Sequence, residues 1–258
     1  MDQMTPRPAA TIVVIREQNQ KLEILMLRRS AQAAAASGAH VFPGGGVDEV
    51  DAEVVRRGLV AGLDAVSAGQ RLELGSGALA YYCAALRELF EEAGLLIALN
   101  AAGDLVEVSD VQLVAWRAEL VTAKVGWPEF LEREGLRLAL GEMHYLAHWV
   151  TPENRSRRFD TRFFLAVAPV GQVARADGHE VTEHLWTTAS AALHRLETAQ
   201  WTMLVPTVHT FRRLAAMGSV DEALAHATTS RVQRTQPREV EHEGRIVVVL
   251  PGEPGYDD

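Results

Sequence analysis

The chain has 258 residues, a formal net charge of −9 and a sequence pI near 5.5, and 48% of its residues are hydrophobic. This length suits one enlarged domain, and the composition is that of a globular protein. Such an acidic chain is a poor general binder of nucleic acid or of anionic membranes, because both repel negative charge. It can still bind an anionic substrate where local arginines and a metal ion reverse the sign.

The single cysteine, Cys83, excludes an intramolecular disulfide and fits a reducing compartment. Its apolar neighbours predict a buried core thiol. The sequence has no secretory signal pattern, and no apolar run approaches the ~18 residues needed to span a bilayer. We therefore expect a cytoplasmic protein without a membrane partner.

The N-terminal part predicts a β-hairpin followed by two helices. Residues 10–15 and 22–27 are rich in β-branched and aliphatic side chains and are separated by a polar run. Residues 53–68 have helical spacing. A longer helix is predicted at 78–93, with Gly94 in the position that often follows a last helical turn.

The rest of the chain alternates predicted helices and strands. Capping patterns and apolar periodicity predict helices at 109–124, from 127, and at 188–199, 206–217 and 219–227. Strands are predicted at 143–150, 159–168, 183–187, 231–236 and 245–250. This interleaved order favours the α/β class, in a single domain over residues 1–258.

Three glutamates lie on barely one turn of the predicted helix at 78–93. Glu88 faces Glu91 and Glu92 at spacings of three and four residues, where like charges repel by roughly a few tenths of a kcal/mol per pair. Arg87 can offset Glu91 but leaves the other two acids uncompensated. Hard divalent ions such as Mg²⁺ or Mn²⁺ use carboxylates together with substrate phosphates. The cluster therefore predicts a metal-assisted phosphate site, with a solvated acidic helix face as the alternative interpretation.

A Phe-Pro-Gly-Gly-Gly run at residues 42–46 lies upstream of this helix. Without a Cβ, Gly44 and Gly45 allow the backbone to approach a ligand closely. We expect these two glycines to contribute to substrate binding.

Together these features resemble the Nudix hydrolase family, whose box reads Gly-x5-Glu-x7-Arg-Glu-U-x-Glu-Glu-x-Gly-U, with U a bulky apolar residue. Residues 87–95 match the second half without a gap, and Gly45 matches the first glycine. An uninterrupted box would place its arginine at 59, so about 28 residues are inserted (87 − 59). Asp51 stands where the family has its first glutamate, so the first acid is either Asp51 or absent.

The resemblance implies an α/β/α sandwich with a mixed sheet and a site on the predicted helix. Inserted segments are expected near 51–78 and 105–140, and a C-terminal extension at 205–258. The expected metal ligands are Glu88, Glu91 and Glu92, with Glu88 also a candidate water-activating base. Arg87 is expected to orient the acids.

A second motif precedes the glycines. Coenzyme A-cleaving members of the family carry Arg-[Ser/Ala]-x3-Arg-x3-Gly-x3-Phe-Pro-Gly-Gly, which Arg29, Gly38 and Phe42 match in spacing. Ala34 stands in place of the second arginine, which removes a forked phosphate donor. The interrupted box and the segment at 157–164 look most like the branch that contains the peroxisomal coenzyme A diphosphatase. Arg29 is therefore a candidate substrate ligand.

Two further candidates come from outside the box. Arg158 belongs to a dense basic group and could clamp a phosphate, although a solvated loop with an ion pair to Asp160 explains the same residues. Glu180 and Glu183 lie in a polar stretch that could supply a general base from a second side, with ordinary surface acids as the alternative. Of the two we select Glu183 as the catalytic candidate.

The sequence thus predicts metal-dependent hydrolysis of a phosphoanhydride in a nucleoside diphosphate derivative. Coenzyme A or acyl-CoA is the leading substrate, followed by ADP-ribose or NADH and then by nucleoside triphosphates. A non-catalytic ligand-binding sensor and an interaction scaffold are the rivals from other classes. The expected partner is a small molecule rather than a nucleic acid, and a homodimer is left open.

Overall fold

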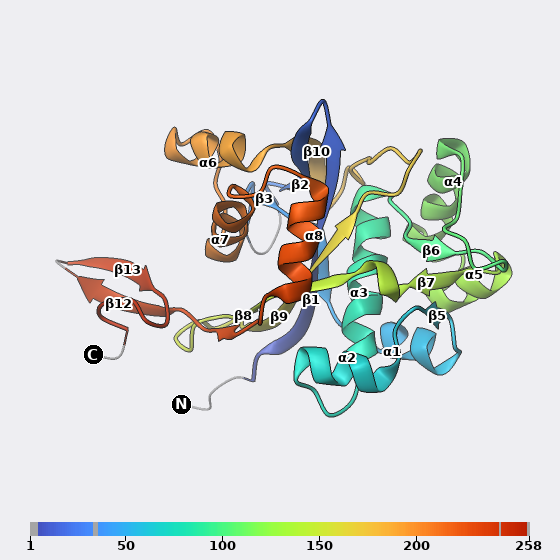
Figure 1. The fold of residues 1–258 in the computed structure, drawn as a ribbon, viewed down its shortest axis with the longest axis horizontal. Helices are drawn as coiled ribbons and strands as arrows, with labels where there is room; N and C mark the ends of the chain where they lie inside the picture. The colour runs from blue at the N-terminus through green and yellow to red at the C-terminus, as the bar shows by residue number, and fades with distance from the viewer. Residues whose placement is uncertain (1–4, 33–35, 243, 257–258) are drawn as a thin grey trace.

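The computed structural model of the chain describes residues 5–32, 36–242 and 244–256. The strands of its main sheet are β1 (Arg7–Gln18), β2 (Lys21–Arg29), β3 (His40–Val41), β4 (Gly44–Gly46), β8 (His144–Val150), β9 (Phe159–Val167), β10 (Val181–Thr187) and β11 (Arg234–Thr235). Their order is β10-β2-β1-β9-β8-β11, with β3 paired to β2 and β4 to β1 (Figure 1). The pairs β1–β9 and β8–β11 are parallel and the other neighbours are antiparallel, so the predicted mixed sheet is confirmed.

The predicted N-terminal hairpin is present as β1 and β2. Asn19 and Gln20 connect the strands with positive φ values of 50° and 59°, as a tight hairpin turn requires. Successive residues of β1 point to opposite faces of the sheet. Ile12 and Val14 therefore enter one buried core, while Val13 and Ile15 enter the other.

One face of the sheet is covered by the predicted long helix and the inserted segments. The helices on this face are α1 (Glu49–Arg56), α2 (Ala65–Leu72), α3 (Ala78–Ala93), α4 (Asp110–Val121) and α5 (Trp127–Arg133). Beside them lie the 3₁₀ turn η1 (Leu140–Glu142) and a small sheet of β5 (Val60–Ala61), β6 (Ala98–Leu99) and β7 (Arg137–Ala139). Helix α3 ends at Gly94, whose φ of 70° suits a residue without a Cβ.

The opposite face is covered by α6 (Ala189–Glu197), α7 (Val205–Leu214) and α8 (Val220–Thr229). A hairpin of β12 (Arg238–His242) and β13 (Arg245–Val249) extends away from this layered body (Figure 1). Helices therefore cover both faces of the sheet, as an α/β/α sandwich requires.

Three details of the sequence analysis are corrected. The single helix predicted at 53–68 is wrong, because Gly58 ends the first helical segment at a φ of 72° and Asp64 caps a new one. The strand predicted at 231–236 is shorter than expected, because only Arg234–Thr235 (β11) is extended and paired. Strand β12 (Arg238–His242) was not predicted. The alternative interpretation of the acidic cluster, a solvated helix face, does not fit Glu92, because only 3% of its surface is exposed.

Two expectations about burial and membranes can also be compared with the structure. Cys83 is fully buried, as its neighbours predicted, and burial raises the pKa of its thiol. Within the described residues, no helix is both long and apolar enough to cross a bilayer.

Candidate active site

The three glutamates occupy the last turns of α3, where the helix lies beside β4. Strand β4 pairs with the start of β1, and this pairing leaves no room for a side chain at Gly44. A Cβ there would lie 2.5 Å from the Ala10 carbonyl oxygen and 2.8 Å from the Thr11 Cα. Because Gly44 has no side chain, its backbone can lie against β1 on one side and against α3 on the other.

Gly45 has a different neighbour. A Cβ on this residue would overlap the Glu88 carboxylate, at 2.5 Å from its Cδ atom. The amide of Gly44 donates a hydrogen bond of 2.9 Å to Glu92 Oε2. Gly44 thus holds Glu92 and Gly45 leaves room for Glu88, while the contact of either glycine with substrate stays a prediction.

Arg87 is the centre of the cluster. Its Nη1 donates to Glu88 Oε1 at 2.9 Å and to Glu91 Oε2 at 3.1 Å, and its Nη2 donates to the Gly46 carbonyl at 2.9 Å. The arginine side chain is only 7% exposed. These bonds connect α3 to β4 and fix the two acids relative to each other.

Asp51 of α1 forms a buried ion pair with Arg87. Its Oδ1 accepts from Arg87 Nε at 2.9 Å, and its Oδ2 accepts from Arg87 Nη2 at 3.1 Å and from the Asp48 amide at 2.9 Å. The Asp51 side chain is fully buried. Both of its oxygens are therefore engaged in positioning the arginine, a role that differs from metal binding.

Burial makes the charged forms of the three glutamates costly. It raises the pKa of Glu88 to about 7, although Arg87 opposes this shift. It also raises the pKa of Glu92 to about 8, with a further increase from the charge of Glu88 and a decrease from the Gly44 hydrogen bond and the charge of Arg29. The pKa of Glu91 is raised as well, again mainly by burial. A nearby cation would relieve this cost.

The donor set fits a hard divalent ion. It consists of carboxylate oxygens alone, which is the chemistry that Mg²⁺ and Mn²⁺ prefer. In the part of the chain that the structure describes, no three His, Cys, Asp or Glu side chains already surround one point as a metal site would. Arg87 Nη1 instead bonds to both Glu88 and Glu91, and each acid uses one oxygen for that bond. The other oxygen of each carboxylate is the candidate ligand atom.

The structure does not bring Glu183 to this cluster. It lies in β10 opposite Arg28, with which it forms an exposed ion pair of 2.9 Å. Leu27 packs on the α3 side of the sheet, so its neighbour Arg28 points to the opposite, α6–α7 side. Glu183 pairs with Arg28 across the strands and therefore points to that side too. The catalytic role of Glu183 stays a prediction.

Glu180 is the acid of this stretch that interacts with the cluster. Its charge adds to the effect of burial in raising the pKa values of Glu91 and Glu92. Its backbone carbonyl accepts from the Ser30 amide at 2.8 Å, which ties the stretch to the end of β2. The sequence analysis named this residue beside Glu183 but selected Glu183 as the catalytic candidate.

The predicted substrate arginines lie at two places. Arg29 is at the end of β2, and its buried Nε meets no hydrogen-bond acceptor among the described residues. Its charge lowers the pKa of Glu92, which places it near the acids. Arg158 is buried at the β8–β9 connection, where its Nε donates to the Thr151 carbonyl at 3.3 Å. Ala34, the departure from the coenzyme A motif, lies outside the described residues.

Arg117 is a site residue that sequence reasoning missed. It extends from α4, and its Nε donates to the Glu91 carbonyl at 2.8 Å while its Nη1 donates to the Arg175 carbonyl at 2.6 Å. A cation at the end of α3 also interacts favourably with the helix dipole. No motif marks this arginine, because its role depends on how the inserted helix packs.

Comparisons with known proteins agree with this geometry. A family model described as the NUDT19 Nudix domain matches residues 55–214, which include all of α3. The chain is 27% identical to acyl-coenzyme A diphosphatase NUDT19 of Xenopus laevis, over 92% of this chain and 72% of that protein. It is 26% identical to the protein of the same name from Gallus gallus, over 92% and 73% of the two chains.

A solved structure is similar over nearly the whole fold. The crystal structure of a NUDIX hydrolase from Alicyclobacillus acidocaldarius superposes with a TM-score of 0.69 at 28% sequence identity. The match covers 88% of this chain and 99% of that one. Most of the fold therefore has a counterpart in a solved NUDIX hydrolase.

Proposed function

The chain belongs to the Nudix hydrolase family, in its NUDT19 branch, and from this premise we propose that it hydrolyses the diphosphate of coenzyme A or acyl-CoA with Mg²⁺ or Mn²⁺. The observation that carries the proposal is the buried acidic cluster of α3. Two relatives that match over 92% of this chain are named acyl-coenzyme A diphosphatases. The proposal extends that activity to this protein.

We assign a separate role to each residue of the cluster. Glu88, Glu91 and Glu92 would hold the divalent ion. Arg87 keeps Glu88 and Glu91 in register, and Asp51 keeps Arg87 in place. When bound, such an ion neutralises the diphosphate and lowers the pKa of the attacking water.

Two acids can accept the proton of that water. Glu88 is one candidate, because its carboxylate lies within the cluster and only its Oε1 bonds to Arg87. Glu180 approaches the acids from the β10 side, so it is better placed than Glu183. Arg29 provides positive charge next to Glu92 for a substrate phosphate. Substrate binding by Gly44, Gly45 and Arg158 belongs to the same proposal.

ADP-ribose and NADH are the second candidates. Ala34 favours them, because the coenzyme A motif has an arginine at that position. A non-catalytic sensor is disfavoured by the retained cluster, since a sensor has no need of a buried acid set. We further propose a single domain over residues 1–258, and the cytoplasmic location and the homodimer remain predictions.

The test is product analysis by mass spectrometry. The wild type is incubated with Mg²⁺ or Mn²⁺ and with coenzyme A, ADP-ribose or NADH, in parallel with Glu91→Gln, Glu92→Gln and the control Glu197→Gln. Glu197 is an exposed acid of α6, on the other face of the sheet.

We expect 3′,5′-ADP and phosphopantetheine from coenzyme A, with most turnover lost in the first two variants and retained in the control. Cleavage of ADP-ribose or NADH alone would overturn the substrate assignment. Retention of full turnover in both cluster variants would overturn the site itself.

A further inference from the structure

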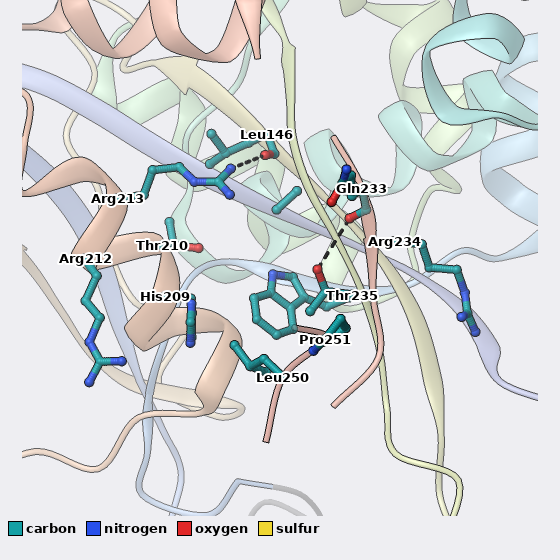
Figure 2. A pocket seen from close by; sticks show the side chains of 12 residues that line it. Leu146, His209, Thr210, Arg212, Arg213, Gln233, Arg234, Thr235, Leu250 and Pro251 are labelled. Carbon is teal, nitrogen blue, oxygen red and sulfur yellow. Dashed lines mark hydrogen bonds between the residues drawn. The ribbon is translucent and has the colours of Figure 1, made fainter. Parts of the chain in front are cut away.

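A cavity of about 500 Å³ lies on the sheet face opposite α3 (Figure 2). Strands β8 and β11, helix α7 and residues 250–251 form its walls. Leu146 and Trp149 of β8 belong to the core on the α7 side, whereas α3 packs on the other core. The cavity is therefore separate from the candidate active site.

The lining of this cavity is basic. Three arginines, Arg212, Arg213 and Arg234, contribute to it, and none of the described lining residues is acidic. Glu253 lies close enough to affect the pKa of His209, but its carboxylate accepts from the Leu250 amide at 2.8 Å. A basic concavity in a chain of net charge −9 selects for anions.

Arg213 is the cation best placed to bind an anion there. Its Nη1 donates to the Leu146 carbonyl at 3.0 Å, which holds the side chain across the cavity. Among the described residues, neither its Nε nor its Nη2 meets an acceptor. Figure 2 shows Arg213 reaching toward Leu146, while Arg212 and Arg234 extend outward on either side.

The same cavity offers a surface for a planar group. The rings of Trp149 and His209 have centroids 5.3 Å apart at an interplanar angle of 56°, and Leu250 and Pro251 complete the apolar side. The hydroxyl groups of Thr210 and Thr235 already donate to the carbonyls of Pro206 and Gln233, so they can offer the ligand only their acceptor capacity. The volume lies within the range of about 300–1,000 Å³ that small-molecule sites occupy.

We propose that this cavity binds an aromatic anion of the size of a nucleoside monophosphate. The planar base contacts Trp149 and Leu250, and the phosphate accepts hydrogen bonds from Arg213. The site goes beyond the proposed hydrolysis, because it uses none of the acids on α3.

Titration calorimetry with AMP tests the proposal. Adenosine probes the apolar surface for the base, and inorganic phosphate probes the contact with Arg213. We expect saturable AMP binding at one site, at least about tenfold tighter than binding of either fragment. R213Q should weaken AMP binding by about tenfold or more, because it removes hydrogen bonds to a charged group. Q233E, which adds a negative charge to the cavity with little change in shape, should weaken it as well.

The matched control is R133Q, which removes the same charge from an exposed side chain of α5, on the other face of the sheet. It should leave AMP affinity within about twofold of the wild type, a difference of under 1 kcal/mol. Failure of the wild type to bind AMP would overturn the proposal. So would AMP binding that is insensitive to both R213Q and Q233E, since that AMP would occupy another site. If inorganic phosphate bound as tightly as AMP, the cavity would be a simple anion site, and the proposed contact of the base with Trp149 and Leu250 would be contradicted.

Discussion

Replacing Glu92 with glutamine should stabilise the metal-free protein at neutral and higher pH. Burial raises the pKa of this carboxyl from 4.5 to about 8, and only 3% of the residue is exposed. The amide oxygen of glutamine can still accept the hydrogen bond from Gly44, so the variant removes the charge and keeps the contact.

The magnitude follows from linkage between protonation and folding. Because the folded pKa lies above the unfolded value, the stabilising effect of the protonated carboxyl is complete below pH 4.5 and is lost as the pH rises through about 8. At pH 7 the cost is on the order of 3 kcal/mol, at about 1.36 kcal/mol per pKa unit. For a chain of this length that corresponds to a Tm roughly 6–12 °C higher in the variant.

Differential scanning calorimetry in EDTA at pH 4.5, 7 and 8 measures this difference, with Glu197→Gln as the matched control. The Tm gain of Glu92→Gln should vanish at pH 4.5 and grow toward pH 8. Added Mg²⁺ should raise the Tm of the wild type and of the control more than that of the variant. A variant that is less stable than the wild type at pH 8 would refute the claim that the charged form of Glu92 is costly.

Three other predictions concern the surroundings of the cluster. Gly45→Ala should lower kcat by at least about tenfold and stability by about 1–3 kcal/mol, because the new Cβ displaces a carboxylate; steady-state kinetics and urea unfolding measure both. Asp51→Ala should lower the free energy of unfolding by about 1–3 kcal/mol, since it leaves the buried Nε of Arg87 without an acceptor; an unchanged urea midpoint would rule this out. Glu180→Gln should lose a larger share of kcat than Glu183→Gln, because Glu180 is the acid that interacts with the cluster; equal or reversed losses would contradict the placement.

Local sequence signals predicted the parts of the fold that depend on regular spacing. The β-rich runs at 10–15 and 22–27 predicted the hairpin of β1 and β2, and the apolar stripe of α3 with its glycine stop predicted that helix closely. The acidic cluster was predicted for the same reason, because three- and four-residue spacing fixes which side chains meet on a helix.

The remaining features depend on contacts between distant segments. Asp51 and Arg87 are 36 residues apart, so their ion pair arises only when α1 packs on α3. The face of Glu183 depends on a register shift between it and Val181. This shift is a β-bulge, in which one extra residue reverses the face to which the following side chains point. Without it, Glu183 would point to the α3 side of the sheet, as Val181 does. The sequence carries no clear mark of such a bulge.

The central claim is that buried carboxylates of α3 bind a divalent cation in place of protons. Its most direct test is calorimetric titration of the metal-free protein with Mn²⁺ at pH 7, in two buffers of different ionisation enthalpy. The account predicts saturable binding with net proton release, because Glu88 and Glu92 have raised pKa values, and loss of that binding in the Glu91→Gln/Glu92→Gln double variant. Mn²⁺ binding that releases no protons, or that persists in the double variant, would contradict it.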